Sequence, residues 1–144
     1  MGKVSVDDIV LTPLRRVPVA GGDVLHAIKR SDPGFSDFGE AYFSMIELGF
    51  VKAWKRHTRM TLNLVVPIGR VRFVFVDDEH RFRELETGED HYCRMTVPPG
   101  LWFGFQGLAA PLSLLLNVAD IEHDPSEVER KDRDDIRFDW GSRT

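Results

Sequence analysis

Short runs rich in Val, Ile, Leu and aromatic residues recur along the chain. They lie at 42–46, 51–55, 61–66, 71–76, 92–97 and 112–119, and residues typical of turns separate them, such as Gly21-Gly22, Pro33-Gly34 and Pro98-Pro99-Gly100. Arg70–Phe73 alternates polar and apolar side chains, as a strand with one face on a core does. The pattern therefore predicts many short strands in a single all-β sandwich or barrel.

No segment carries a long apolar stripe at helical spacing. The best helical candidate is short, at 125–131, and Asp124 is placed to cap its start. The stretch EVERKDRDD that overlaps it is highly charged, as a solvated surface turn is. We therefore expect a short helical or irregular segment at the C-terminal end of the domain.

Size and charge exclude several classes of protein. The 144 residues suit one domain with a substantial core, and the net charge of −4 argues against a general nucleic-acid or anionic-membrane binder. The apolar runs at 64–68 and 114–116 are too short to span a bilayer, and the first ten residues lack the apolar region of a signal peptide. The single cysteine, Cys93, excludes an internal disulfide and fits a reducing compartment, so we expect a cytoplasmic protein.

Two segments resemble the signature segments of a cupin barrel, namely WKRHTRMTLNLVVPIG at 54–69 and PPGLWFGF at 98–105. A metal-binding cupin has two histidines and a glutamate in the first segment and a third histidine in the second. Here those positions read His57, Arg59, Asn63 and Phe103, so one ligand of four is present. Because transition metals need several N, O or S donors, we expect neither a metal nor another cofactor.

Taken in order, six segments suggest a narrower family. They are GDVLHAIKRSD (22–32), GEAYFSMIELGFVKAWKRH (39–57), GRVRFVFVDD (69–78), TVPPGLWFGFQGL (96–108), and LLNVADIEHDP (115–125) with IRFDW (136–140). They resemble the small cupins related to dTDP-4-dehydrorhamnose 3,5-epimerase, which act on nucleotide-linked 4-keto-6-deoxy sugars. The resemblance implies a jelly-roll barrel over 22–140, an N-terminal arm or edge strand over 1–21 and a tail at 141–144. It also implies a homodimer.

The same resemblance implies roles for particular residues. In the epimerases a histidine at the position of His57 removes the proton beside the ketone, and an aspartate near the C-terminus orients it. Asp132 or Asp134 is the nearest match to that aspartate. In the epimerases a tyrosine on a late strand serves as the opposing acid. The matching region of this chain is Leu115-Leu116, so that tyrosine is absent here. The related 3,4-ketoisomerases carry a tyrosine about one strand before their histidine pair, and Tyr42 lies at a similar place before His57.

Side-chain alternation predicts which residues share the barrel lumen. If 55–63 is one extended strand, His57, Arg59 and Asn63 project to the same face, with Trp54 and Leu62 opposite. We expect Arg59 and Asn63 to hold an enolate or phosphate oxygen, since the arginine fork grips phosphate in two places.

Three further residues are candidates for substrate contacts, each with an alternative. Arg94 would contact a pyrophosphate or lie on the surface. Trp102 would stack on a nucleobase or sugar, or pack in the barrel. Asn117 would line the pocket or stabilise a turn by a hydrogen bond.

Two functions follow from these residues. The first is an isomerase or epimerase of a nucleotide-linked 4-keto-6-deoxyhexose, acting by metal-independent proton abstraction with His57 as the base and Tyr42 and Asp132 as further catalytic residues. The second is a cupin that binds a sugar nucleotide without catalysis. The absence of the late-strand tyrosine favours the second, whereas His57 with Tyr42 and Arg59 favours the first.

Overall fold

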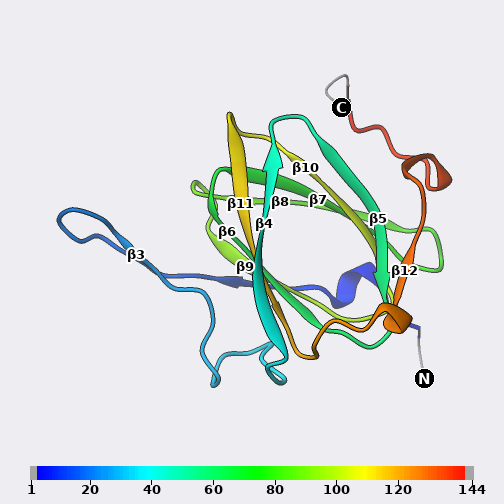
Figure 1. The fold of residues 1–144 in the computed structure, drawn as a ribbon, viewed down its shortest axis with the longest axis horizontal. Coiled ribbons are helices and arrows are strands. Elements are labelled where there is room, and N and C mark those ends of the chain that lie inside the picture. The colour runs from blue at the N-terminus through cyan, green and yellow to red at the C-terminus, as the bar shows by residue number, and fades with distance from the viewer. Residues whose placement is uncertain (1–2, 142–144) are drawn as a thin grey trace.

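The computed structural model describes residues 3–141 and shows two antiparallel sheets that face each other (Figure 1). Sheet I has the order β1 (Val10–Pro13), β9 (Cys93–Val97), β6 (Leu62–Ile68), β11 (Leu112–Ala119) and β4 (Glu40–Glu47). Sheet II has the order β12 (Val128–Arg130), β5 (Val51–His57), β10 (Trp102–Gly107), β7 (Arg70–Val76) and β8 (Phe82–Gly88). The predicted all-β, cupin-like single domain is confirmed.

The remaining elements are short. Strands β2 (Arg16–Val17) and β3 (Val24–Leu25) form a hairpin that projects away from the barrel (Figure 1). Three 3₁₀ turns complete the described part of the chain: η1 (Val6–Asp8), η2 (Pro125–Glu127) and η3 (Arg133–Asp135). No helix within residues 3–141 is long and apolar enough to cross a membrane.

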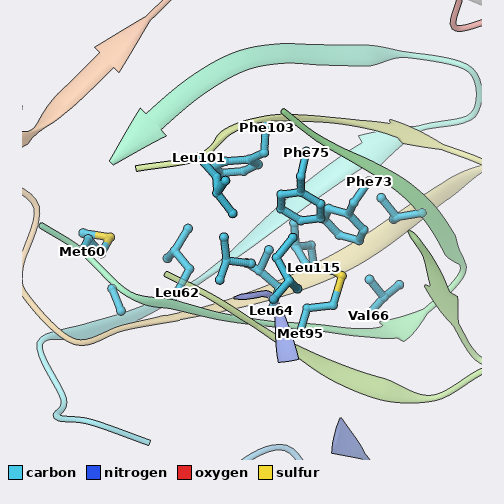
Figure 2. Close-up of a cluster of buried hydrophobic side chains, with 14 of the residues drawn as sticks. Met60, Leu62, Leu64, Val66, Phe73, Phe75, Met95, Leu101, Phe103 and Leu115 are labelled. Atoms are coloured by element: carbon cyan, nitrogen blue, oxygen red, sulfur yellow. The ribbon is translucent and has the colours of Figure 1, made fainter. Parts of the chain in front are cut away.

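The core lies between the sheets because alternate residues of each strand point inward. Figure 2 shows Phe73, Phe75 and Phe103 of sheet II facing Leu64 and Met95 of sheet I. Gly69, at φ +87°, makes the tight turn from β6 to β7, where a Cβ atom would collide with Ser113. The interior is thus filled by side chains at this end of the barrel.

All six runs expected as strands are strands, and β8 and β10 were not among them. Strand β8, FRELETG, is an outer strand rich in charged residues, and the two glycines of β10, WFGFQG, interrupt its strand-favouring aromatic residues. The predicted helix at 125–131 is confirmed only as the turn η2, capped by Asp124, since Val128–Arg130 form a strand.

The N-terminal region is partly an edge strand, since β1 pairs with β9 in sheet I. The boundary expected after residue 21 falls inside the β2–β3 hairpin. Of the expected tail at 141–144, only Gly141 is among the described residues, and of the N-terminal arm residues 1–2 are outside them.

Candidate active site

A pocket of about 620 Å³ opens into the barrel between the two sheets. Four strands and the C-terminal segment 130–135 line it. The side chains from the strands include Tyr42 and Ser44 of β4, Lys55 of β5, Phe103 and Phe105 of β10, and Asn117 of β11. This volume is within the range of small-molecule sites.

The pocket carries an excess of positive charge. Lys52, Lys55, Arg130 and Lys131 line it, against the two carboxylates of Asp132 and Asp135. Within residues 3–141, none of the four cations forms an ion pair. Such a concave, cationic site attracts an anionic ligand.

Lys55 is one of two cations that strand β5 contributes to the pocket, the other being Lys52. Lys55 pairs across the sheet with Phe103, and its Nζ lies 5.8 Å from the centre of the Phe103 ring. Burial lowers the pKa of Lys55 below the ordinary value, and the nearby Arg130 lowers it further, while Glu127 opposes the shift.

His57 lies two residues further along the same inward face of β5 and is 5% exposed. Its Nδ1 is 2.5 Å from Oε1 of Glu127, which is also fully enclosed. The second carboxylate oxygen, Oε2, accepts the backbone N–H groups of Thr58, Arg59 and Met60, each at 3.1 Å. These four contacts fix the carboxylate and the imidazole ring together.

The Glu127 carboxylate also sets the tautomer of His57. Burial alone would raise the pKa of Glu127, but the hydrogen bonds from His57 and from the backbone outweigh it and hold that pKa below its usual range. An ionised carboxylate only accepts hydrogen bonds, so Nδ1 carries the proton and Nε2 carries the lone pair. Burial lowers the pKa of His57 despite the opposing effect of Glu127, which favours the neutral ring.

The Nε2 atom of His57 is enclosed by protein and has no hydrogen-bond partner among residues 3–141. The ring is stacked 6.2 Å from Phe103, which lines the pocket, whereas His57 itself does not. His57 therefore stands directly behind the pocket wall, next to Lys55.

Tyr42 and Asn117 meet on the opposite wall, where β4 pairs with β11. Burial, and then the neighbouring Glu40, raise the pKa of Tyr42, so its phenol stays protonated at neutral pH and can donate a proton. The Asn117 amide donates to the Ser44 hydroxyl at 3.2 Å and holds that wall together.

The predicted continuous strand 55–63 is wrong. Strand β5 ends at His57 and β6 begins at Leu62 in the other sheet, because the three N–H groups of residues 58–60 all turn toward Glu127. Extended backbone points successive N–H groups in opposite directions and cannot do this. Arg59 and Asn63 consequently do not share the face of His57.

Asn63 and Arg94 lie together on the outer face of sheet I. Arg94 is fully buried, and its guanidinium donates to Asn63 Oδ1 at 3.1 Å and to the carbonyls of Ala27 and Pro33 at 2.8 and 2.7 Å. Their side chains fasten the segment 27–34 over the sheet. The structure does not bring either residue into the pocket.

Arg59 and Trp102 are also outside the pocket. The Arg59 side chain is 57% exposed and pairs with Asp124 at 2.7 Å. Trp102 lies on the outer face of sheet II, where the cations of Arg56 and Lys131 stand 4.6 and 4.7 Å from its ring.

The residue that holds His57 is Glu127, not the predicted Asp132 or Asp134. Asp132 lines the pocket but precedes η3, where its backbone N–H bonds Asp135, and Asp134 is exposed within η3. The sequence offered one clue to Glu127, the turn Asp124-Pro125 that positions it, but no spacing that links it to His57. Within residues 3–141, no group of three or more His, Cys, Asp or Glu side chains is arranged to hold a metal ion.

Known proteins resemble the chain both in sequence and in fold. No protein-family model matches the chain. The probable low-salt glycan biosynthesis epimerase Agl13 of Haloferax volcanii is 32% identical over 113 residues, which cover 71% of this chain and 72% of that protein.

Two crystal structures have a similar fold. A dTDP sugar isomerase from Desulfovibrio desulfuricans matches with a TM-score of 0.90 and 38% identity, over 94% of this chain and 92% of that chain. The dTDP-4-dehydrorhamnose 3,5-epimerase of Bacillus anthracis, with TDP and PPi bound, matches with a TM-score of 0.80 and 16% identity, over 96% of this chain and 89% of that chain. The second likeness concerns the fold alone.

Proposed function

Because the chain belongs to the cupin family of dTDP-sugar epimerases and isomerases, we propose that it epimerises or isomerises a 4-keto-6-deoxyhexose linked to a nucleoside diphosphate. The observation that carries this proposal is the pocket, where four cations without ion-pair partners line a cavity beside the His57–Glu127 pair. The diphosphate of a sugar nucleotide supplies the negative charge that these cations lack. The relatives named above support the choice of a dTDP sugar.

The proposed chemistry is proton transfer beside the ketone, without a metal. His57 is the base: its Nδ1 donates to Glu127, so Nε2 is the atom that accepts the proton from carbon. Tyr42, with its raised pKa, is the acid that returns a proton from the opposite wall. A general acid and base of this kind supply about 10²–10⁴-fold in rate each.

One observation favours a second candidate, a cupin that binds the sugar nucleotide without turning it over. The Nε2 atom of His57 is closed off from the pocket by its surroundings, including the stacked ring of Phe103. Proton abstraction requires the substrate to reach this atom, which a binding protein has no need to expose.

Hydrogen exchange distinguishes the two candidates. The protein is incubated with dTDP-4-keto-6-deoxyglucose in deuterium oxide, and the sugar protons are followed by NMR while calorimetry measures dTDP binding. We expect exchange at a carbon beside the ketone that disappears in His57→Asn, with dTDP binding preserved. Binding without exchange in the wild type would establish the second candidate instead.

We also propose that the protein is a homodimer. Phe43 and Met45, 62% and 61% exposed, lie on the outward face of β4, at the edge of sheet I. A long apolar edge strand is commonly covered in the assembled protein. Light scattering should show a dimer that Phe43→Glu converts to a monomer, and a monomeric wild type would contradict this proposal.

A further inference from the structure

Lys55 lies in the wall of the pocket, and sequence reasoning gave it no role. We propose that Lys55 is a further catalytic residue, whose ammonium group donates a hydrogen bond to the ketone oxygen of the sugar and stabilises the enolate that forms there. This rests on the proposed function, since it concerns the same pocket and the same proton transfer. It adds a residue that acts on the oxygen while His57 acts on the carbon.

The geometry of β5 places the two groups for one substrate. Lys55 and His57 are two residues apart on the inward face of the strand, which separates their Cα atoms by about 7 Å. Both side chains contact the same ring, since the Lys55 Nζ is 5.8 Å and the His57 ring 6.2 Å from the centre of Phe103. A ketone oxygen and the hydrogen on the neighbouring carbon are close together in a sugar ring, so a substrate that reached Nε2 of His57 would bring its ketone oxygen to Lys55.

The Lys55 ammonium is left available for a ligand. Within residues 3–141 it forms no ion pair and no hydrogen bond, and its contact is the apolar face of Phe103. Lys52 of the same strand differs, because its Nζ donates to the Met45 carbonyl at 2.8 Å and the side chain is exposed. A partly buried cation without a partner costs stability, which is expected where the charge serves a substrate.

The charged groups around Lys55 come from several elements. Glu127 lies behind it, Arg130 stands opposite on the paired strand β12, and Lys52 precedes it on β5. The partial burial of Lys55 also strengthens its interaction with a developing negative charge. In this proposal Lys55 acts on the charge that the reaction creates, and Lys52, Arg130 and Lys131 remain for the fixed charge of the diphosphate.

The step balances as follows. Nε2 of His57 takes the proton from the carbon beside the ketone, and the electron pair of the broken C–H bond forms a carbon–carbon double bond. The π electrons of the carbonyl move to its oxygen, which accepts the hydrogen bond from Lys55. Return of a proton to carbon restores the ketone, and no oxidant or reductant is consumed.

The test compares three variants in the exchange assay with dTDP-4-keto-6-deoxyglucose: Lys55→Met, Lys55→Arg and Lys52→Met. We expect Lys55→Met to lower kcat for exchange by about 10²–10³-fold, the loss typical when one hydrogen-bond donor to a developing oxyanion is removed. Lys55→Arg keeps the positive charge and should recover part of this loss. Lys52→Met removes an exposed pocket cation that lies further from His57 along β5 and donates to the Met45 carbonyl, so it should raise KM with little effect on kcat.

The melting temperature distinguishes a catalytic role of Lys55 from a structural one. Since the ammonium forms no ion pair or hydrogen bond in the part of the chain that the structure describes, Lys55→Met should melt at the same temperature as the wild type or higher. A lower melting temperature with unchanged kcat would show a structural residue and overturn the proposal.

The failure of this proposal is distinguishable from failure of the proposed function. Wild-type exchange that Lys55→Met retains within about threefold, or loses only through KM, overturns the role of Lys55 and leaves the function standing. A wild type that binds dTDP but exchanges no proton refutes the function and the role of Lys55 together.

Discussion

Replacing Glu127 by glutamine should invert the tautomer of His57. The glutamine oxygen can still accept the N–H groups of residues 58–60, which leaves its NH₂ group facing Nδ1 of His57. An amide NH₂ donates and does not accept, so Nδ1 must lose its proton and Nε2 must gain it. The substitution thus removes the basic lone pair from Nε2 without removing the imidazole.

The cost in stability follows from the contacts to the carboxylate. Hydrogen bonds to a charged acceptor contribute about 1.5–3 kcal/mol, and those to a neutral one about 0.5–1.5 kcal/mol. With three backbone donors weakened by about 1 kcal/mol each, and a smaller burial cost for the neutral side chain, the free energy of unfolding should fall by about 2–3 kcal/mol. Proton exchange should fall by about 10²–10⁴-fold, since the base is lost.

The free energy of unfolding should also depend on pH, in a direction that can be checked. The folded pKa of Glu127 lies below its ordinary value of 4.5. The ionised carboxylate therefore contributes its full stability above pH 4.5, and the contribution is lost as the pH falls through the folded pKa. The difference between wild type and Glu127→Gln should be largest near neutrality and shrink below pH 4.5.

Three measurements test it. Urea unfolding at several pH values gives the free energies, ¹⁵N NMR of the imidazole gives the protonated nitrogen, and deuterium exchange gives the rate. Glu129→Gln is the matched control, because Glu129 is exposed and its pair with Arg56 should contribute no more than about 1 kcal/mol. If Glu127→Gln keeps the proton on Nδ1, or unfolds with wild-type stability at pH 7, the reasoning is refuted.

Further substitutions test two arginines that lie outside the pocket and the titration of His57. Arg94→Met should lower the free energy of unfolding by about 3–5 kcal/mol, because buried partners lose their donor, while dTDP affinity measured by calorimetry stays unchanged. Arg59→Ala should change stability by less than about 1 kcal/mol and leave KM unchanged, since this arginine is exposed and outside the pocket; a large rise in KM would contradict that placement. The wild type should lose stability relative to His57→Asn as the pH falls below 6.5 in urea titrations, because burial lowers the folded pKa of His57 and the unfolded chain takes up the proton first.

The fold was predictable because its strands carry a local signal. Alternating or continuous apolar residues mark β4, β6, β7 and β11, and the turns between them hold glycine or proline. Strand β8 lacked this signal because it is an outer strand rich in charged residues, whose pairing with β7 is set by the sheet rather than by its own sequence.

The site was only partly predictable, for reasons that differ between residues. Tyr42 and Asn117 line the pocket because each lies on the inward face of a regular strand, and for Asn117 this is one of the two alternatives that the sequence left open. Lys55 could have been found by the same alternation, since it is two residues before His57. Glu127 could not, because a turn brings it to His57 from a distant part of the chain and no pattern of spacing records such a contact.

Arg59 and Asn63 were misplaced through one assumption, that the strand continued beyond His57. The carboxylate of Glu127 collects three consecutive N–H groups and ends the strand there. A side chain elsewhere in the chain thus decides where this strand stops, which lies beyond any local analysis.

The contact between His57 and Glu127 also has a consequence for how the protein is made. Seventy residues separate the two partners along the chain. During synthesis, residues 57–60 leave the ribosome several seconds before residue 127, at the usual rate of about 5–20 residues per second. Until then the imidazole and the three backbone donors lack the Glu127 carboxylate. The segment 130–135, which lines the pocket, has not yet been synthesised. The His57–Glu127 pair is therefore among the last parts of the nascent chain to form, and a chain interrupted before residue 127 cannot form it.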